Sequence, residues 1–132
     1  MRHISNFAMF ESVNAKDVKE FLTDFGWLIS MNFSQIQQQA VDDDARKQLV
    51  LMMAELRKPI LNGKKYSDFI SDNFAEIPRN PKLLSAVLGI VRDYLVYMKP
   101  RIERFVMDGE RKVYWLKKID ELGDTYRRII QQ

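Results

Sequence analysis

Apolar positions with helical spacing are densest between residues 83 and 98, in the stretch LLSAVLGIVRDYLVYM. The most regular of them follow one another in steps of four and three, which places them on one side of a helix. They are Leu84, Leu88, Val91, Leu95 and Met98. Further apolar residues widen that side until most of the circumference is apolar. A helix of this kind is typical of the centre of a bundle, where it has neighbours on several sides.

Other segments carry apolar residues at helical spacing along one side only. Their pattern predicts four more helices. These run from about 14 to 31, from about 42 to between 57 and 62, from about 66 to 77, and from about 110 to 130. Asn14 is the expected N-cap of the first. The short segment 34–41 is interpreted as a separate helix, because Ser34 and Gln37 have the spacing of a capping box. The alternative is a first helix that runs without a break to Ala40.

Two features define the ends of the central helix. Asn80 and Pro81 are residue types that commonly open a helix. Near the other end, Pro100 lacks a backbone N–H, yet the apolar spacing continues past it to Phe105. The sequence therefore favours a helix that is kinked at Pro100 and reaches about residue 107 over a helix that stops at Met98.

The elements together predict an all-α, single-domain bundle of five or six helices around a central apolar helix at about 82–98. The length of 132 residues is typical of one domain, and the low numbers of Gly (5) and Pro (4) favour long helices over turn-rich strands. Residues 1–13 are interpreted either as an arm laid across the bundle or as a first helical turn. The domain is expected to span residues 1–132.

Composition limits the chemistry and the surroundings. The chain has no cysteine, which excludes disulfides, thiolate nucleophiles and sulfur-bound metals and suits a reducing cytoplasm. The uncharged apolar run 83–91 is about half the length that crosses a bilayer. We therefore expect a cytoplasmic protein with no membrane segment.

Catalytic and metal-binding motifs are missing from the sequence. His3 is the only histidine and lies almost at the start, and phosphate-binding glycine loops and nucleophile elbows do not occur. Asp68, Asp72 and Glu76 repeat every four residues, a pattern interpreted as the polar side of a helix because the accompanying histidines of helical metal sites are lacking. We expect no enzyme activity, no cofactor and no metal.

Positive charge gathers in the second half of the chain. Residues 79–132 carry a net charge of +5, whereas residues 1–78 carry −2. Five basic residues near Pro100 and Gly109 are candidate contacts for nucleic acid or another anionic partner: Lys99, Arg101, Arg104, Arg111 and Lys112. The competing interpretation is that ion pairs four residues apart use up much of this charge, with Arg104 and Asp108, Lys117 and Glu121, and Asp124 and Arg128 as the expected pairs.

Four residues lie off the main apolar sides of their helices and are candidates for a surface that binds a protein partner. They are Val96, Tyr97, Val113 and Tyr114. Taken with the rich core and the missing catalytic motifs, they favour a non-catalytic helical protein–protein interaction module: an adaptor, an assembly subunit or a regulatory domain.

Two alternative functions fit the same residues. One is a nucleic-acid-binding subunit of a nucleoprotein complex that uses the basic half. The other is a ligand-sensing helical domain cut from a longer signalling protein, suggested by a last helix that reaches Ile130 without a stop signal. Assembly as a homo-oligomer is compatible with all three functions.

Overall fold

The computed structural model describes residues 15–31 and 33–131, and these residues confirm the all-α bundle. Six α-helices and two short 3-10 turns make 84% of the described residues helical. The helices are α2 (Ala15–Met31), α3 (Phe33–Gln38), α4 (Asp43–Leu56), α5 (Tyr66–Asn73), α6 (Pro81–Phe105) and α7 (Glu110–Gln131). The turns are η1 (Leu61–Gly63) and η2 (Ile77–Arg79). The predicted arm or turn at 1–13 and the expected N-cap Asn14 lie outside the described residues.

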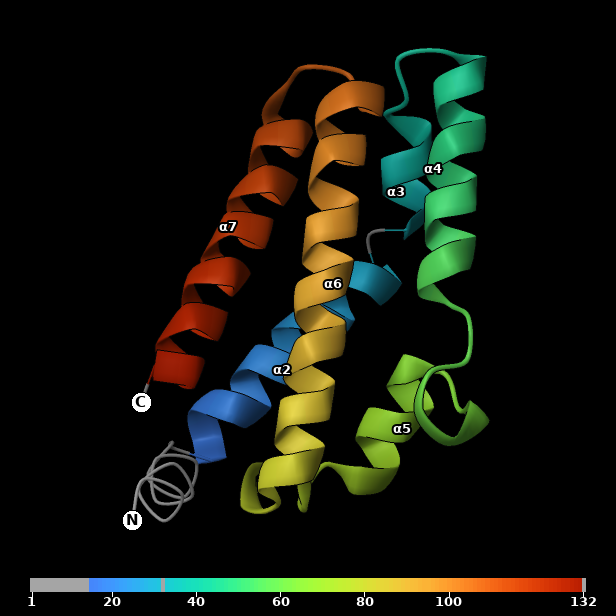
Figure 1. Cartoon of the computed structure of the whole chain (residues 1–132). Coiled ribbons are helices and arrows are strands. Elements are labelled where there is room, and N and C mark those ends of the chain that lie inside the picture. Colours follow the sequence, from blue (N-terminus) through green and yellow to red (C-terminus); the bar gives the residue numbers. More distant parts are fainter. Residues whose placement is uncertain (1–14, 32, 132) are drawn as a thin grey trace.

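Helix α6 occupies the centre of the bundle, between α4 and α7 (Figure 1). It begins as predicted, with Pro81 in its first turn and the Asn80 side chain accepting a hydrogen bond of 3.1 Å from the backbone N–H of Leu83. It continues through Pro100 and ends at Phe105, close to the predicted end at 107. Its buried residues are Leu84, Val87, Leu88, Val91, Leu95, Met98 and Ile102, which confirms the predicted apolar side.

A pair of backbone hydrogen bonds holds the end of α6 to the segment that connects α3 with α4. The N–H of Val41 donates to the carbonyl of Phe105 over 2.9 Å, and the N–H of Met107 donates to the carbonyl of Gln39 over 2.7 Å. These bonds enclose an isolated antiparallel bridge between Ala40 and Val106. They satisfy backbone groups just beyond two helix ends, where helical partners are lacking.

Three predicted boundaries need correction. Helix α3 begins at Phe33, so Ser34 lies inside it and the expected capping box does not mark its start. Helix α4 ends at Leu56, just before the predicted range of 57–62. The helix predicted for 66–77 ends at Asn73, and Ile77 opens the turn η2 instead. Pro78 lacks the backbone N–H that an α-helix through this position would need, and it fits the start of the separate turn η2.

The core is one connected cluster of apolar side chains drawn from α2 through α7. Among the described residues no charged side chain is buried, and Tyr66 is buried together with its hydroxyl. The largest fully buried side chain is Trp115 of α7, which belongs to this cluster together with Ile119 and Leu122 of the same helix. In the described part of the chain, every helix is too short or too polar to span a bilayer.

The stability of the bundle is expected to depend on α6. Leu88 is buried on α6, whereas Val96 on the same helix is 68% exposed. We predict that Leu88→Ala lowers the free energy of unfolding by about 2–5 kcal/mol, because the substitution leaves a cavity in a packed core. Val96→Ala should change it by less than about 0.5 kcal/mol. Urea unfolding followed by circular dichroism measures both, and equal losses would contradict the central position of α6.

Candidate protein-binding groove

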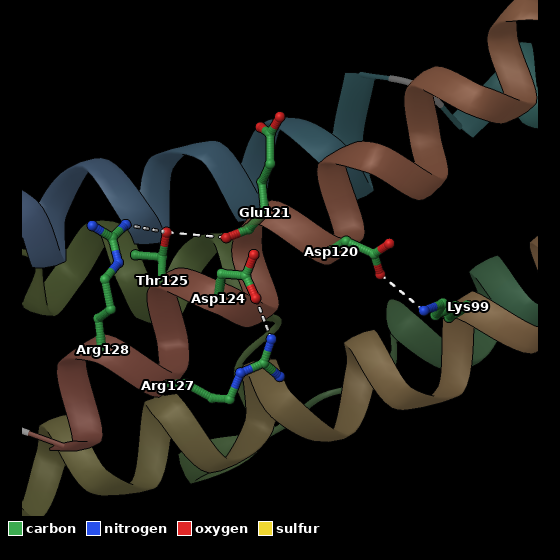
Figure 2. A network of polar contacts seen from close by, with 7 residues as sticks. All are labelled: Lys99, Asp120, Glu121, Asp124, Thr125, Arg127 and Arg128. Carbon is green, nitrogen blue, oxygen red and sulfur yellow. Dashed lines mark hydrogen bonds and ion pairs between the residues drawn. The ribbon is translucent and has the colours of Figure 1, made fainter.

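The basic residues named above are each engaged by groups of the same chain. Lys99 of α6 forms an ion pair with Asp120 of α7, with 2.9 Å between Nζ and Oδ1 (Figure 2). The hydrogen bond to Asp120 and its negative charge raise the pKa of Lys99. This pair bridges the two antiparallel helices on the outside of the bundle, where both side chains remain about half exposed.

Arg101 and Lys112 fold back onto neighbouring backbone. The guanidinium of Arg101 lies 3.7 Å from the centre of the Tyr97 ring and donates to the Tyr97 carbonyl over 2.9 Å. The ammonium of Lys112 donates to the Glu103 carbonyl over 2.6 Å and pairs with Asp108 over 3.0 Å. The Lys112 side chain is only 14% exposed, much less than the 45% of Lys99.

The remaining two cations point toward different parts of the bundle. Arg104 lies with its guanidinium 5.3 Å from the ring centre of Phe105, and Arg111 donates to Gln35 of α3 over 2.5 Å. The structure therefore ties these five cations to separate local partners. Their role toward nucleic acid or another anion stays a prediction.

The ion pairs along α7 differ from the predicted ones. Asp108 pairs with Lys112 and not with Arg104, and Glu121 pairs with Lys118, 3.8 Å away. Figure 2 shows the second half of α7, where Arg127 pairs with Asp124 and Arg128 donates to the Thr125 hydroxyl over 3.1 Å. Partners three and four residues apart share one side of a helix, so spacing alone could not choose between them.

The four apolar candidates form two pairs of successive residues, one pair on α6 and one on α7. Val96 and Tyr97 are successive residues of α6 and therefore point about 100° apart around the helix. Val96 lies on the same side of α6 as Lys99, which pairs with Asp120 of α7. The guanidinium of Arg101 covers the ring of Tyr97. Val113 and Tyr114 are also successive, on α7, and both are exposed. Their role as a partner surface stays a prediction.

A groove between α2 and α5 is the most distinctive surface feature that the sequence did not reveal. It has a volume of about 550 Å³, and apolar side chains dominate its walls. Trp27 stands at its edge and is 58% exposed, an unusual position for so large an apolar side chain. The apolar wall residues are Leu22 and Trp27 of α2 with Tyr66, Ile70 and Phe74, and hydroxyls come from Thr23, Ser67 and Ser71.

The floor of the groove is held by an aromatic cluster. Phe25 meets the Tyr66 ring edge-on at 5.2 Å and stacks with Tyr94 of α6 at 6.0 Å. The Tyr66 hydroxyl donates a long hydrogen bond of 3.5 Å to the Leu22 carbonyl. Lys19 places its ammonium 5.6 Å from the centre of the Phe74 ring. The groove is thus a built surface, fixed to the core through rings from three helices.

One signal in the sequence pointed toward this groove. Trp27 lies off the apolar side that Val18, Leu22, Phe25 and Ile29 define, so a helix at this position had to expose it. The second wall could not be found in the same way, because nothing in the sequence states that residues 66–74 lie against residues 22–27.

Comparisons with protein-family models, with curated proteins and with solved structures found no match to this chain. Within the residues that the structure describes, no group of three or more His, Asp or Glu side chains is arranged to hold a metal ion. The site therefore has to be interpreted from its own shape and chemistry.

Because of Tyr66, the free energy of unfolding is expected to fall as the pH rises in the alkaline range. Burial, and to a lesser extent the charge of Tyr94, raises the pKa of Tyr66 far above the ordinary tyrosine value of about 10. Above that pH the unfolded chain loses the Tyr66 proton while the folded chain keeps it. Folding is therefore fully favoured below about pH 10 and becomes less favoured as the pH rises toward the folded pKa.

We predict that Tyr66→Phe reduces the loss of stability between about pH 9.5 and about pH 11.5, because phenylalanine has no proton to release. The measurement is urea unfolding at a series of pH values for both proteins. Equal slopes of the free energy of unfolding against pH would show that the Tyr66 hydroxyl is not buried as described.

Proposed function

We propose that this protein is a cytoplasmic, non-catalytic helical interaction module that binds an amphipathic helix of a protein partner in the groove between α2 and α5. It would act as an adaptor, an assembly subunit or a regulatory domain. The observation that carries the proposal is the exposed ring of Trp27 beside an apolar groove with a rigid aromatic floor.

The energetics of protein interfaces support this use of Trp27. Tryptophan is enriched among the few interface residues that supply most of the binding energy, and such residues are centred in apolar, well-packed pockets. The groove volume of about 550 Å³ lies within the range of about 300–1,000 Å³ that is typical of ligand pockets. Covering Trp27 and the groove would remove from water the kind of apolar surface that drives association.

The shape of the groove favours a helix as the ligand. Its two walls are helices, α2 and α5, and a third helix laid between them would present apolar side chains at positions i, i+3 or i+4, and i+7. The hydroxyls of Thr23, Ser67 and Ser71 lie among the lining residues and can bond polar groups at the edge of such a helix.

The two tryptophans supply a built-in test. Trp27 is largely exposed and Trp115 is buried, so a ligand in the groove should shift emission to shorter wavelength and reduce acrylamide quenching. Ligands would be selected from a displayed library of helical peptides with fixed apolar i, i+4 and i+7 positions. We predict that Trp27→Ala weakens the selected peptides by about 30-fold or more, a typical loss at a central interface residue.

Val113→Ala provides the matched control, because it also removes an exposed apolar side chain but on α7. It should leave peptide affinity unchanged, and Trp27→Phe should abolish the shift in emission. A library that yields no binder to the groove, or equal losses for Trp27→Ala and Val113→Ala, would contradict the proposal.

The alternative of a nucleic-acid-binding subunit rests on the net charge of +5 in residues 79–132. Because the five candidate cations already have local partners, we predict weak binding to labelled RNA and DNA that disappears above about 0.15 M salt. Titration at several salt concentrations measures this. Tight binding that is lost on Arg101→Glu or Arg104→Glu but not on Trp27→Ala would favour the alternative.

A further inference from the structure

Three apolar residues interrupt the otherwise polar, exposed side of α4. Leu51 is 60% exposed, and Val50 and Ala54 are exposed beside it. Helix α4 forms one edge of the bundle and packs its other side on α6 (Figure 1). The apolar α4 face, defined here by Val50, Leu51 and Ala54, therefore has no cover within the described residues.

Charged residues flank this face in a symmetric order. Lys47 and Glu55 each lie four residues from Leu51, one before it and one after it. Asp44 and Lys58 each lie seven residues from Leu51, again on opposite sides. Asp44, Lys47, Leu51 and Glu55 fall on the same side of α4, because steps of three and four residues return to one side. Lys58 follows two residues after the end of the helix at Leu56. Each charge thus has an opposite charge at the same distance from Leu51.

We propose that the apolar α4 face binds a second copy of this chain, with the two α4 helices antiparallel about a two-fold axis through Leu51. In this arrangement Leu51 meets Leu51, Lys47 lies opposite Glu55 of the second copy, and Asp44 lies opposite its Lys58. The same surface serves both copies, as a two-fold dimer requires. A parallel pairing would place Lys47 beside Lys47 and Asp44 beside Asp44, so the charges select the antiparallel one.

The acidic end of α4 also has room for the basic end of the second copy. A cavity of about 510 Å³ lies beside Asp42, Asp44 and Gln48, with Arg104 and Phe105 in its wall. The Lys58 side chain is 66% exposed and forms an ion pair with Glu55 of its own chain, 2.7 Å away. In the antiparallel dimer this ammonium reaches a surface that carries two carboxylates, Asp42 and Asp44, and one guanidinium, Arg104.

The size of the α4 face sets the expected affinity. A helix of 14 residues is about 21 Å long, and the pairing of one helix per copy falls at or below the small end of specific interfaces. We therefore expect a reversible dimer that forms at micromolar or higher concentration. This inference is independent of the groove, because the α4 face shares no residue with it.

Sedimentation equilibrium of the full chain from about 10 µM to about 1 mM tests the dimer. Leu51→Glu should raise the dissociation constant by at least about tenfold, because two carboxylates would meet at the axis. Val96→Glu is the matched control on α6 and should leave it unchanged. Peptide binding in the groove should survive Leu51→Glu, which separates failure of the dimer from failure of the proposed function.

Charge reversal tests the register. Lys47→Glu and Glu55→Lys should each weaken the dimer several-fold, because each brings like charges together twice across the axis. The double variant restores the opposite pairs and should recover the original affinity. Thermal unfolding by circular dichroism confirms that all variants fold. Single variants without effect, or a double variant as weak as the single ones, would overturn the proposed register.

A disulfide test locates the axis directly, since the chain has no cysteine of its own. Leu51→Cys should give a covalent dimer under mild oxidation, because two-fold symmetry brings the two sulfur atoms together. Val96→Cys should not do so under the same conditions. A monomer at every concentration, or equal cross-linking of both variants, would overturn the dimer.

Discussion

Burial of the apolar side of α6 is the constraint on which the rest of the structure depends. Seven of its residues, from Leu84 to Ile102, are buried, and this is more apolar surface than one neighbouring helix can cover. Helices α4 and α7 therefore flank α6 (Figure 1), and α2 completes the core through Phe25, which stacks on Tyr94. The short helices α3 and α5 would be marginal alone, and most of the stability of every helix comes from this shared packing.

The periodic part of this arrangement could be predicted, and the boundaries that depend on local chemistry could be predicted in part. Steps of three and four residues located α6 and α7, and Asn80 with Pro81 located the start of α6. Ile77 was misplaced, because its burial fits a helical pattern while Pro78 lacks the backbone N–H that an α-helix through this position would need. The spacing of apolar residues shows which residues are buried. It does not show whether a buried residue lies in a helix or in a turn, because both contain buried residues.

The candidate site was harder to predict, because each part of it is formed by residues far apart in the sequence. The groove needs α2 beside α5, and the Lys99–Asp120 pair needs the register of α6 against α7. The sequence gives the net charge of +5 for residues 79–132, but it does not show where in the structure the charged side chains lie or which groups they contact. The charge is spread over ion pairs and backbone contacts, whose partners depend on side-chain conformations that spacing does not determine.

These observations favour apolar over charged surface as the basis of recognition. An exposed ion pair contributes about 0–1 kcal/mol and is weakened by salt, and the pairs along α7 could exchange partners at little cost. Covering the exposed part of one tryptophan side chain is worth about 3 kcal/mol. Since Trp27 and Leu51 are held on helices fixed to the core, little conformational entropy is lost when a partner covers them. The charges around them then decide orientation, which is the role that exposed charges perform best.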